Sequence, residues 1–203
     1  NYSVNTGKRI KAFYQDFDGT EKVNIQINIP DRPILQMKDE SCKEYENGKI
    51  TNNSISITLP SVKNISNEII VNNNIADNTN ILLDQTGTYN ITVTATDIAG
   101  NKAEDKYIVK IDKDAPTIKG VENGQVYYDS ITPNIQDNNS IAEVKLYLNG
   151  KEINTYVPNS TIADFGQYKL EATDEAGNTT TITFEIVNLN IDDIKQYTIK
   201  EDK

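Results

Sequence analysis

A short phrase that recurs along the chain constrains its fold most strongly. It reads Asp97-Ile98-Ala99-Gly100-Asn101 and again Asp174-Glu175-Ala176-Gly177-Asn178, and a degenerate copy reads Asp16-Phe17-Asp18-Gly19-Thr20. The first two copies lie 77 residues apart (174 − 97), and the degenerate copy begins 81 residues before Asp97 (97 − 16). A repeat of this period predicts an array of similar small domains.

Apolar and polar residues alternate in the runs that flank these phrases. The apolar positions that share one face of such runs are Val23, Ile25, Ile27 and Ile29, then Tyr89, Ile91, Val93 and Ala95, then Tyr107, Val109 and Ile111, and finally Ile182, Phe184 and Ile186. A period of two is typical of half-buried strands, and Ile, Val, Thr and Tyr suit them. The sequence therefore predicts an all-β fold.

The recurring phrases have the composition of hairpin turns between the last two strands of each domain. Gly100 and Gly177 supply the positive φ that a tight loop requires, and the aspartate that opens each phrase bonds its own backbone. A Gly-x-Tyr step enters the preceding strand at Tyr89 and Tyr168. This step is typical of a tyrosine corner, so both rings are expected in the core.

The repeat extends beyond these turns and fixes the domain boundaries. Glu46-Asn47-Gly48-Lys49-Ile50 matches Glu122-Asn123-Gly124-Gln125-Val126 at an offset of 76 (122 − 46). Proline favours strand starts and junctions, so Pro33 and Pro116 mark the beginnings of two domains.

We therefore expect two complete β-sandwiches at 33–113 and 114–188. Residues 1–32 are expected to be the C-terminal hairpin of a preceding unit. Residues 189–203 are expected to be a tail or the start of a following unit, as a strand or a short helix.

Composition excludes several classes of function. The chain has no histidine and a single cysteine, Cys42, so it has no Ser-His-Asp triad, no internal disulfide and no zinc cluster of thiolates. The net charge is −10, which argues against nucleic acid and anionic membranes as partners. No apolar run approaches ~20 residues, so no membrane insertion is expected.

The Gly-x-Tyr step, the Thr-Asp-x-Ala-Gly-Asn turn and the Asp112-Lys113-Asp114-Ala115-Pro116 junction together resemble bacterial immunoglobulin-like repeat domains. These domains occur in tandem in secreted and wall-attached proteins of Gram-positive bacteria. The resemblance covers about 33–188 and the hairpin before it. It implies tandem immunoglobulin-like β-sandwiches in an extracellular setting, secreted or attached to the cell wall.

Carboxylates near the junction and in the turns are candidate calcium ligands, namely Asp97, Asp112, Asp114 and Asp174. Calcium takes six to eight oxygen ligands, which clustered Asp and Asn side chains can supply. The alternative is that these aspartates serve only turn formation and solvation. No other cofactor is expected.

Three tyrosines are candidate ligand contacts, namely Tyr127, Tyr128 and Tyr147, because alternate residues of a strand face outward. The alternative is that they fill space between strands.

A cross-link between a lysine and an asparagine side chain is a separate possibility for this chain, because such isopeptide bonds are found in some related wall proteins.

These features favour a non-catalytic module of a large surface protein, which acts as a semi-rigid spacer or adhesion region. Its partners would be neighbouring immunoglobulin-like domains and a host protein or glycan. The alternative is an accessory, glycan-binding module of a secreted glycosidase or protease whose catalytic domain lies outside this chain.

Overall fold

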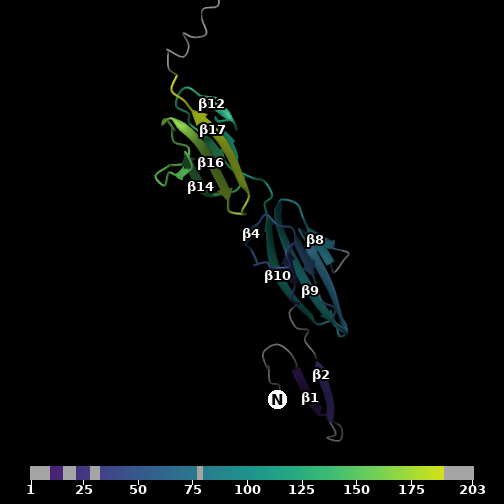
Figure 1. Cartoon of the computed structure of the whole chain (residues 1–203). Helices are drawn as coiled ribbons and strands as arrows, with labels where there is room; N and C mark the ends of the chain where they lie inside the picture. Colours follow the sequence, from purple (N-terminus) through teal and green to yellow (C-terminus); the bar gives the residue numbers. More distant parts are fainter. Residues whose placement is uncertain (1–9, 16–21, 28–32, 77–79, 190–203) are drawn as a thin grey trace, which may run out of the picture. The chain divides into compact units, whose positions relative to one another are not determined.

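The chain forms two compact units in the computed structural model, which describes residues 10–15, 22–27, 33–76 and 80–189 (Figure 1). Unit 1 ends at Asp112 and unit 2 begins at Lys113, one residue before the boundary expected from the sequence. All regular elements of the described residues are strands, which confirms the predicted all-β class.

The N-terminal segment contains one antiparallel pair. Strand β1 (Ile10–Gln15) pairs with β2 (Lys22–Ile27), with Ile10 opposite Ile27 and Gln15 opposite Lys22. An antiparallel pair was expected in this segment, and its assignment to a preceding unit stays a prediction. Its turn at Asp16 to Thr20 and the tail after Leu189 lie outside the described residues.

Unit 1 contains a β-sandwich of a three-stranded and a five-stranded sheet. The smaller sheet has the order β3 (Gln36–Asp39), β5 (Ile55–Thr58), β8 (Asn80–Leu83). The larger sheet has the order β4 (Ile50–Thr51), β10 (Lys102–Ile111), β9 (Gly87–Asp97), β6 (Ile65–Val71), β7 (Asn74–Ala76). All these pairs are antiparallel except β4–β10, which is parallel.

Unit 2 repeats this arrangement. Its five-stranded sheet has the order β12 (Gln125–Tyr127), β17 (Thr179–Ile186), β16 (Gly166–Asp174), β14 (Ile141–Leu148), β15 (Lys151–Glu152). The edge pair β12–β17 is again parallel. The opposite sheet is the pair β11 (Thr117–Lys119) and β13 (Asn134–Gln136).

Each unit has its own apolar core. The fully buried residues of the first core come from both sheets, as Ile55 and Ile57 lie on β5 while Ile91 and Val93 lie on β9. The second core is built around Leu170, Phe184 and other residues of β16 and β17. The alternation seen in the sequence therefore places every second residue of the long strands between the sheets.

A tyrosine corner closes each core, as the Gly-x-Tyr steps suggested. The Tyr89 hydroxyl donates to the Gln85 carbonyl at 2.9 Å, and the Tyr168 hydroxyl donates to the Asp164 carbonyl at 2.8 Å. The Tyr168 ring is buried and stacks on Phe184 with centroids 5.0 Å apart. These bonds hold the chain that leads into β9 and β16.

The Tyr168 corner should contribute measurable stability, and Tyr156 offers a matched control. Replacing Tyr168 by Phe keeps the ring but removes the bond to Asp164, so we expect a loss of about 1 kcal/mol in the free energy of unfolding. The buried Tyr156 hydroxyl makes no hydrogen bond of normal geometry to any described residue, although the Asn159 N–H approaches it, so Tyr156→Phe should cost clearly less than Tyr168→Phe. Urea unfolding of both variants measures the difference, and equal losses would contradict it.

Candidate functional site

Asparagine side chains join neighbouring strands at matching places in the two units. In unit 1, the backbone N–H of Ile108 on β10 donates to Asn47 Oδ1 at 2.7 Å, and the Gly48 N–H donates to the Ile108 carbonyl at 2.8 Å. One residue of the last strand therefore has both backbone groups bonded by a single Asn-Gly corner. We call such a pair of bonds an asparagine clamp.

The same clamp occurs in unit 2. The Thr183 N–H on β17 donates to Asn123 Oδ1 at 2.8 Å, and the Gly124 N–H donates to the Thr183 carbonyl at 2.6 Å. Both Asn-Gly corners directly precede the parallel edge strand, β4 or β12. They therefore extend the hydrogen bonding between that strand and the last strand of the unit.

A second clamp lies at the hairpin that follows β6 or β14. Asn72 has positive φ, its N–H donates to the Asn90 carbonyl at 2.9 Å, and its Oδ1 accepts the Asn90 N–H at 2.8 Å. Asn149 makes the same two bonds to Gln167, at 2.8 and 3.0 Å. Asparagine suits this position because its short amide tolerates a left-handed backbone.

The clamps are the feature that the sequence interpretation missed. The matching Asn47-Gly48 and Asn123-Gly124 were recognised only as evidence of a repeat. A tight turn explains the glycine at these positions, but it does not explain the asparagine before it. An asparagine kept before that glycine in both copies was the available signal. A carboxamide oxygen can replace a backbone carbonyl as the acceptor for a strand N–H.

The recurring aspartate turns are held by their own polar groups. In the first, Asp97 Oδ1 accepts the Asn101 N–H at 2.8 Å and the Ala99 N–H at 2.9 Å, while Oδ2 accepts the Asn101 amide at 2.8 Å. The Asn101 side chain, with the nearby backbone N–H groups, lowers the pKa of Asp97 below its ordinary value. This stabilisation is present above the ordinary carboxyl pKa and is lost as the pH falls through the lowered one.

The candidate calcium ligands are placed differently from one another. Asp97 lies in the turn of unit 1 just described, and Asp112 is fully buried at the end of that unit. In unit 2, Asp137 and the buried Asp174 each offer a carboxylate oxygen within 4.8 Å of the other. Asp114 Oδ2 accepts the Asn138 amide at 3.2 Å.

Asp174 is also committed to its turn, because its two carboxylate oxygens accept the backbone N–H and the side-chain amide of Asn178, each at 2.8 Å. The Asp114 carbonyl accepts the same side-chain amide at 3.2 Å. Asp137, which the sequence interpretation did not single out, adds a second carboxylate beside Asp174. Calcium binding here stays a prediction.

Two of the candidate ligand tyrosines lie at or near the edge strand β12. The Tyr127 ring packs against the core edge-on to Phe184, with centroids 6.2 Å apart, and its hydroxyl accepts the Glu122 N–H at 2.8 Å. Tyr128 is 61% exposed in the loop that follows. The structure therefore gives Tyr127 a packing role and leaves Tyr128 in the solvent.

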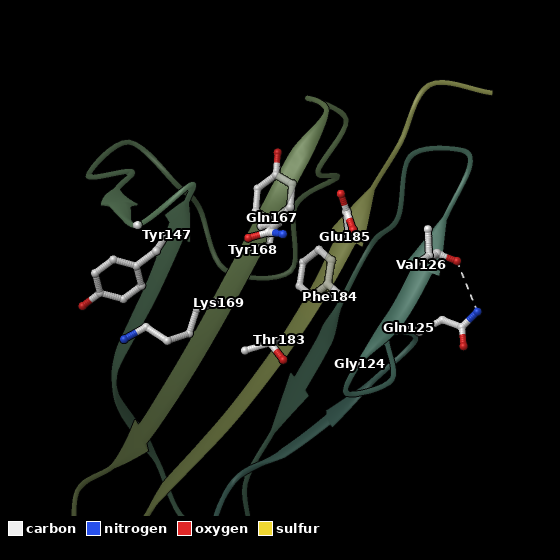
Figure 2. Close-up of a pocket in the computed structure, with 11 residues that line it drawn as sticks. Gly124, Gln125, Val126, Tyr147, Gln167, Tyr168, Lys169, Thr183, Phe184 and Glu185 are labelled. Atoms are coloured by element: carbon white, nitrogen blue, oxygen red, sulfur yellow. Dashed lines mark hydrogen bonds between the residues drawn. The ribbon is translucent and has the colours of Figure 1, made fainter. Parts of the chain in front are cut away.

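Tyr147 borders a hollow of about 510 Å³ on the five-stranded sheet of unit 2 (Figure 2). Side chains from β12, β14, β16 and β17 line it, and Gly124 and Gly150 leave room at its rim. The volume falls in the range of small-ligand sites. Of the three candidate tyrosines, only Tyr147 borders this hollow.

The hollow combines an aromatic ring with polar groups. Lys169 Nζ lies over the Tyr147 ring, 4.2 Å from its centroid, and also pairs with Glu171 at 3.1 Å. Among the described residues, the side chains of Gln167 and Glu185 have no hydrogen-bond or ion-pair partner. These two groups are therefore available to a bound molecule.

The corresponding face of unit 1 has different chemistry. The cross-strand pair Tyr147–Lys169 of unit 2 corresponds to Ile70–Thr92 of unit 1, which lies at the same register from the Asn72 clamp. An aliphatic side chain and a hydroxyl replace the ring and the cation. The two units thus share a scaffold but not this surface.

None of the lysines within 33–76 and 80–189 is buried. An isopeptide cross-link needs a buried lysine next to an asparagine and an acid, because water otherwise solvates the amine. The isopeptide alternative is therefore wrong for the part of the chain whose burial is described. The same residues also contain no helix that could cross a membrane.

Comparison with known sequences shows a relative that matches part of the chain. A segment of 75 residues is 43% identical to part of the outer cell wall protein of Brevibacillus brevis. This segment makes up 37% of this chain and 7% of that protein. The chain thus matches only a small part of a much longer protein. No family model matches the chain.

Several solved structures share the class of fold at low identity. They include fibronectin(III)-like modules of Clostridium thermocellum CbhA, at 19% identity and a TM-score of 0.34, covering 75% of this chain and 93% of that one. Murine CEACAM1b is 14% identical with a TM-score of 0.38, covering 76% of this chain and all of that one. The β-sandwich assignment rests on the sheets and cores described above.

The clamp at Asn123 should be worth about one hydrogen bond. Asn123→Ala removes the acceptor of the Thr183 N–H and, at 3.2 Å, of the exposed Thr183 hydroxyl, which can bond water instead, so we expect a loss of about 1 kcal/mol in the free energy of unfolding. Asn123→Asp keeps an oxygen at that place and should retain most of the stability. Chemical denaturation of the three proteins is the measurement, and an Ala variant as stable as the parent would refute the clamp's contribution.

Proposed function

We propose that this chain is a non-catalytic structural module of a cell-surface protein, and that its units act as spacers that resist tension along the chain. The observation that carries the proposal is the parallel pairing of an early strand with the last strand in each unit. The argument below concerns each unit separately.

The parallel pairing determines how each unit resists unfolding when tension is applied along the chain. In unit 1 the chain enters the larger sheet at β4 and leaves it from β10, with Ile50 opposite Lys110 and Thr51 opposite Ile111. Because the two strands run in the same direction, tension on the chain slides one along the other. The hydrogen bonds between them then share the load and must break together.

The Asn-Gly clamps strengthen this same junction. The Asn47 clamp adds two bonds to β10 before β4 begins, and the Asp112 N–H donates to the Thr51 carbonyl beyond its end, at 2.9 Å. In unit 2 the Asn123 clamp precedes β12, and the Val187 N–H donates to the Tyr127 carbonyl at 2.9 Å. Both units thus extend a short parallel ladder at each end.

The relative supports a location at the cell surface. The matching segment belongs to an outer cell wall protein. The single Cys42 means that neither unit is closed by an internal disulfide. The asparagine clamps and the packed apolar cores stabilise each unit instead. Adhesion to a host and a Gram-positive source remain parts of the proposal.

Single-molecule force spectroscopy on the whole chain tests the proposal. The variant with both Asn47→Ala and Asn123→Ala should unfold about fivefold faster at a fixed force, because each unit loses a bond worth about 1 kcal/mol that is under load. Asn72→Ala is the matched control, since it removes the same kind of bond at a hairpin between β6 and β7.

The control should lower stability in urea but leave unfolding under force nearly unchanged. Equal acceleration by both sets of substitutions would contradict the role of the parallel pair. An unfolding force in the parent too low to distinguish from that of an unstructured chain would refute the spacer function itself.

The hollow of unit 2 favours a second candidate function, an accessory module that binds a neutral polysaccharide. Carboxylate and amide groups such as Glu185 and Gln167 bond sugar hydroxyls, and the edge of the Tyr147 ring can pack against a sugar. Lys169 is already paired with Glu171 and lies over the Tyr147 ring. The Glu185 carboxylate is therefore left as a charge in the hollow that is unpaired among the described residues, and this charge disfavours an acidic sugar and so supports a neutral one.

A glycan array, followed by titration calorimetry with any polysaccharide that binds, tests this candidate. Gln167→Ala and Tyr147→Ala should each weaken binding at least tenfold, the equivalent of about 1.4 kcal/mol. Thr92→Ala, at the position of unit 1 that corresponds to Lys169, should leave the affinity unchanged. Binding that survives both unit 2 substitutions would remove the hollow as the site.

A further inference from the structure

Three Asn-Gly steps lie within the described residues, and all three asparagines have an activated carboxamide. Asn47, Asn123 and Asn149 each accept a strand N–H at Oδ1, at 2.7, 2.8 and 3.0 Å. A donor at that oxygen stabilises the negative charge that develops there when a nucleophile attacks Cγ. The hydrogen bond that holds the strand therefore also polarises the carboxamide of the asparagine.

The three steps differ at the nitrogen that would attack. The Gly48 N–H donates to the Ile108 carbonyl, and the Gly124 N–H donates to the Thr183 carbonyl. In the third clamp the donor is the N–H of Asn149 itself, and the Gly150 N–H makes no hydrogen bond among the described residues. Asn149 and Gly150 are both exposed, so water reaches them.

We propose that Asn149 is a site of spontaneous deamidation in the folded protein, while the Asn47 and Asn123 clamps protect their own steps. The Gly150 nitrogen attacks Asn149 Cγ and loses its proton to water, and the side-chain nitrogen leaves as ammonia after taking up a proton. The resulting succinimide is opened by water at either carbonyl. The product is an aspartate or an isoaspartate at position 149.

The surroundings of Asn149 make the two products differ in effect. An aspartate keeps an oxygen acceptor for the Gln167 N–H and adds a negative charge. An isoaspartate lengthens the backbone of a two-residue hairpin between β14 and β15, so the clamp cannot close. A Cβ built on Gly166 would lie 2.9 Å from the Asn149 side-chain amide, so this amide packs closely against Gly166 and loses that contact when the isoaspartate draws it into the backbone.

Unit 1 contains a natural comparison at the same hairpin. There the step is Asn72-Asn73, with the same clamp to Asn90 and with Asn73 at φ 67°, close to the 80° of Gly150. A side chain on the attacking residue obstructs the approach of its nitrogen to Cγ. The Gly150→Asn variant therefore reproduces a hairpin that this fold already accepts, but with the reaction hindered.

The test is incubation of the whole folded chain in warm, mildly alkaline buffer, followed by digestion and mass spectrometry of the three Asn-Gly peptides. Electron-transfer fragmentation separates isoaspartate from aspartate. We expect the Asn149 peptide to deamidate about fivefold faster than the other two, since one hydrogen bond of about 1 kcal/mol has that effect on a rate. In denaturant the three rates should become similar, because the clamps are gone.

Gly150→Asn should reduce the rate at position 149 to that at Asn72, while the rates at Asn47 and Asn123 stay unchanged. Circular dichroism and urea unfolding check that this variant folds. The proposal is overturned if Asn149 reacts no faster than the two clamped steps in the folded chain. It is equally overturned if Gly150→Asn folds and leaves the rate at position 149 as it was.

Discussion

The use of a side-chain carboxamide as a strand partner is the interaction on which both units depend. Each unit has a short edge strand, β4 or β12, that could contribute only a few backbone bonds alone. Asn47 and Asn123 add an acceptor beside it, and the following glycine adds a donor. A net hydrogen bond is worth only about 1 kcal/mol, but a domain of this size has little stability to spare.

Much of the fold could be predicted from local patterns. Alternation in β9, β10 and β17 revealed the strands, and the aspartate turns with their glycines revealed the closing hairpins. Tyr89 and Tyr168 were expected in the core because a Gly-x-Tyr step has one common structural use. These features are local in sequence, so a single chain without relatives is enough to recognise them.

The clamps at Asn47 and Asn123 could not be predicted in the same way, because they join residues about 60 positions apart. Asn47 bonds Ile108, and nothing in either segment alone indicates the other. The hollow was also hidden, because Tyr147 becomes part of a surface only when β16 pairs with β14 and β17 pairs with β16. Asp137 was missed for a similar reason, since its proximity to Asp174 depends on a loop and a turn from different parts of unit 2.

The two separate cores have a consequence for how such a chain fails. Ile55 and Leu170 belong to different clusters of buried residues, so the apolar packing of each unit is built without side chains of the other. Loss of packing in one cluster therefore does not directly expose the other. Under the proposed spacer role, a chain of self-contained domains lengthens one domain at a time under load, and each domain that stays folded continues to bear tension.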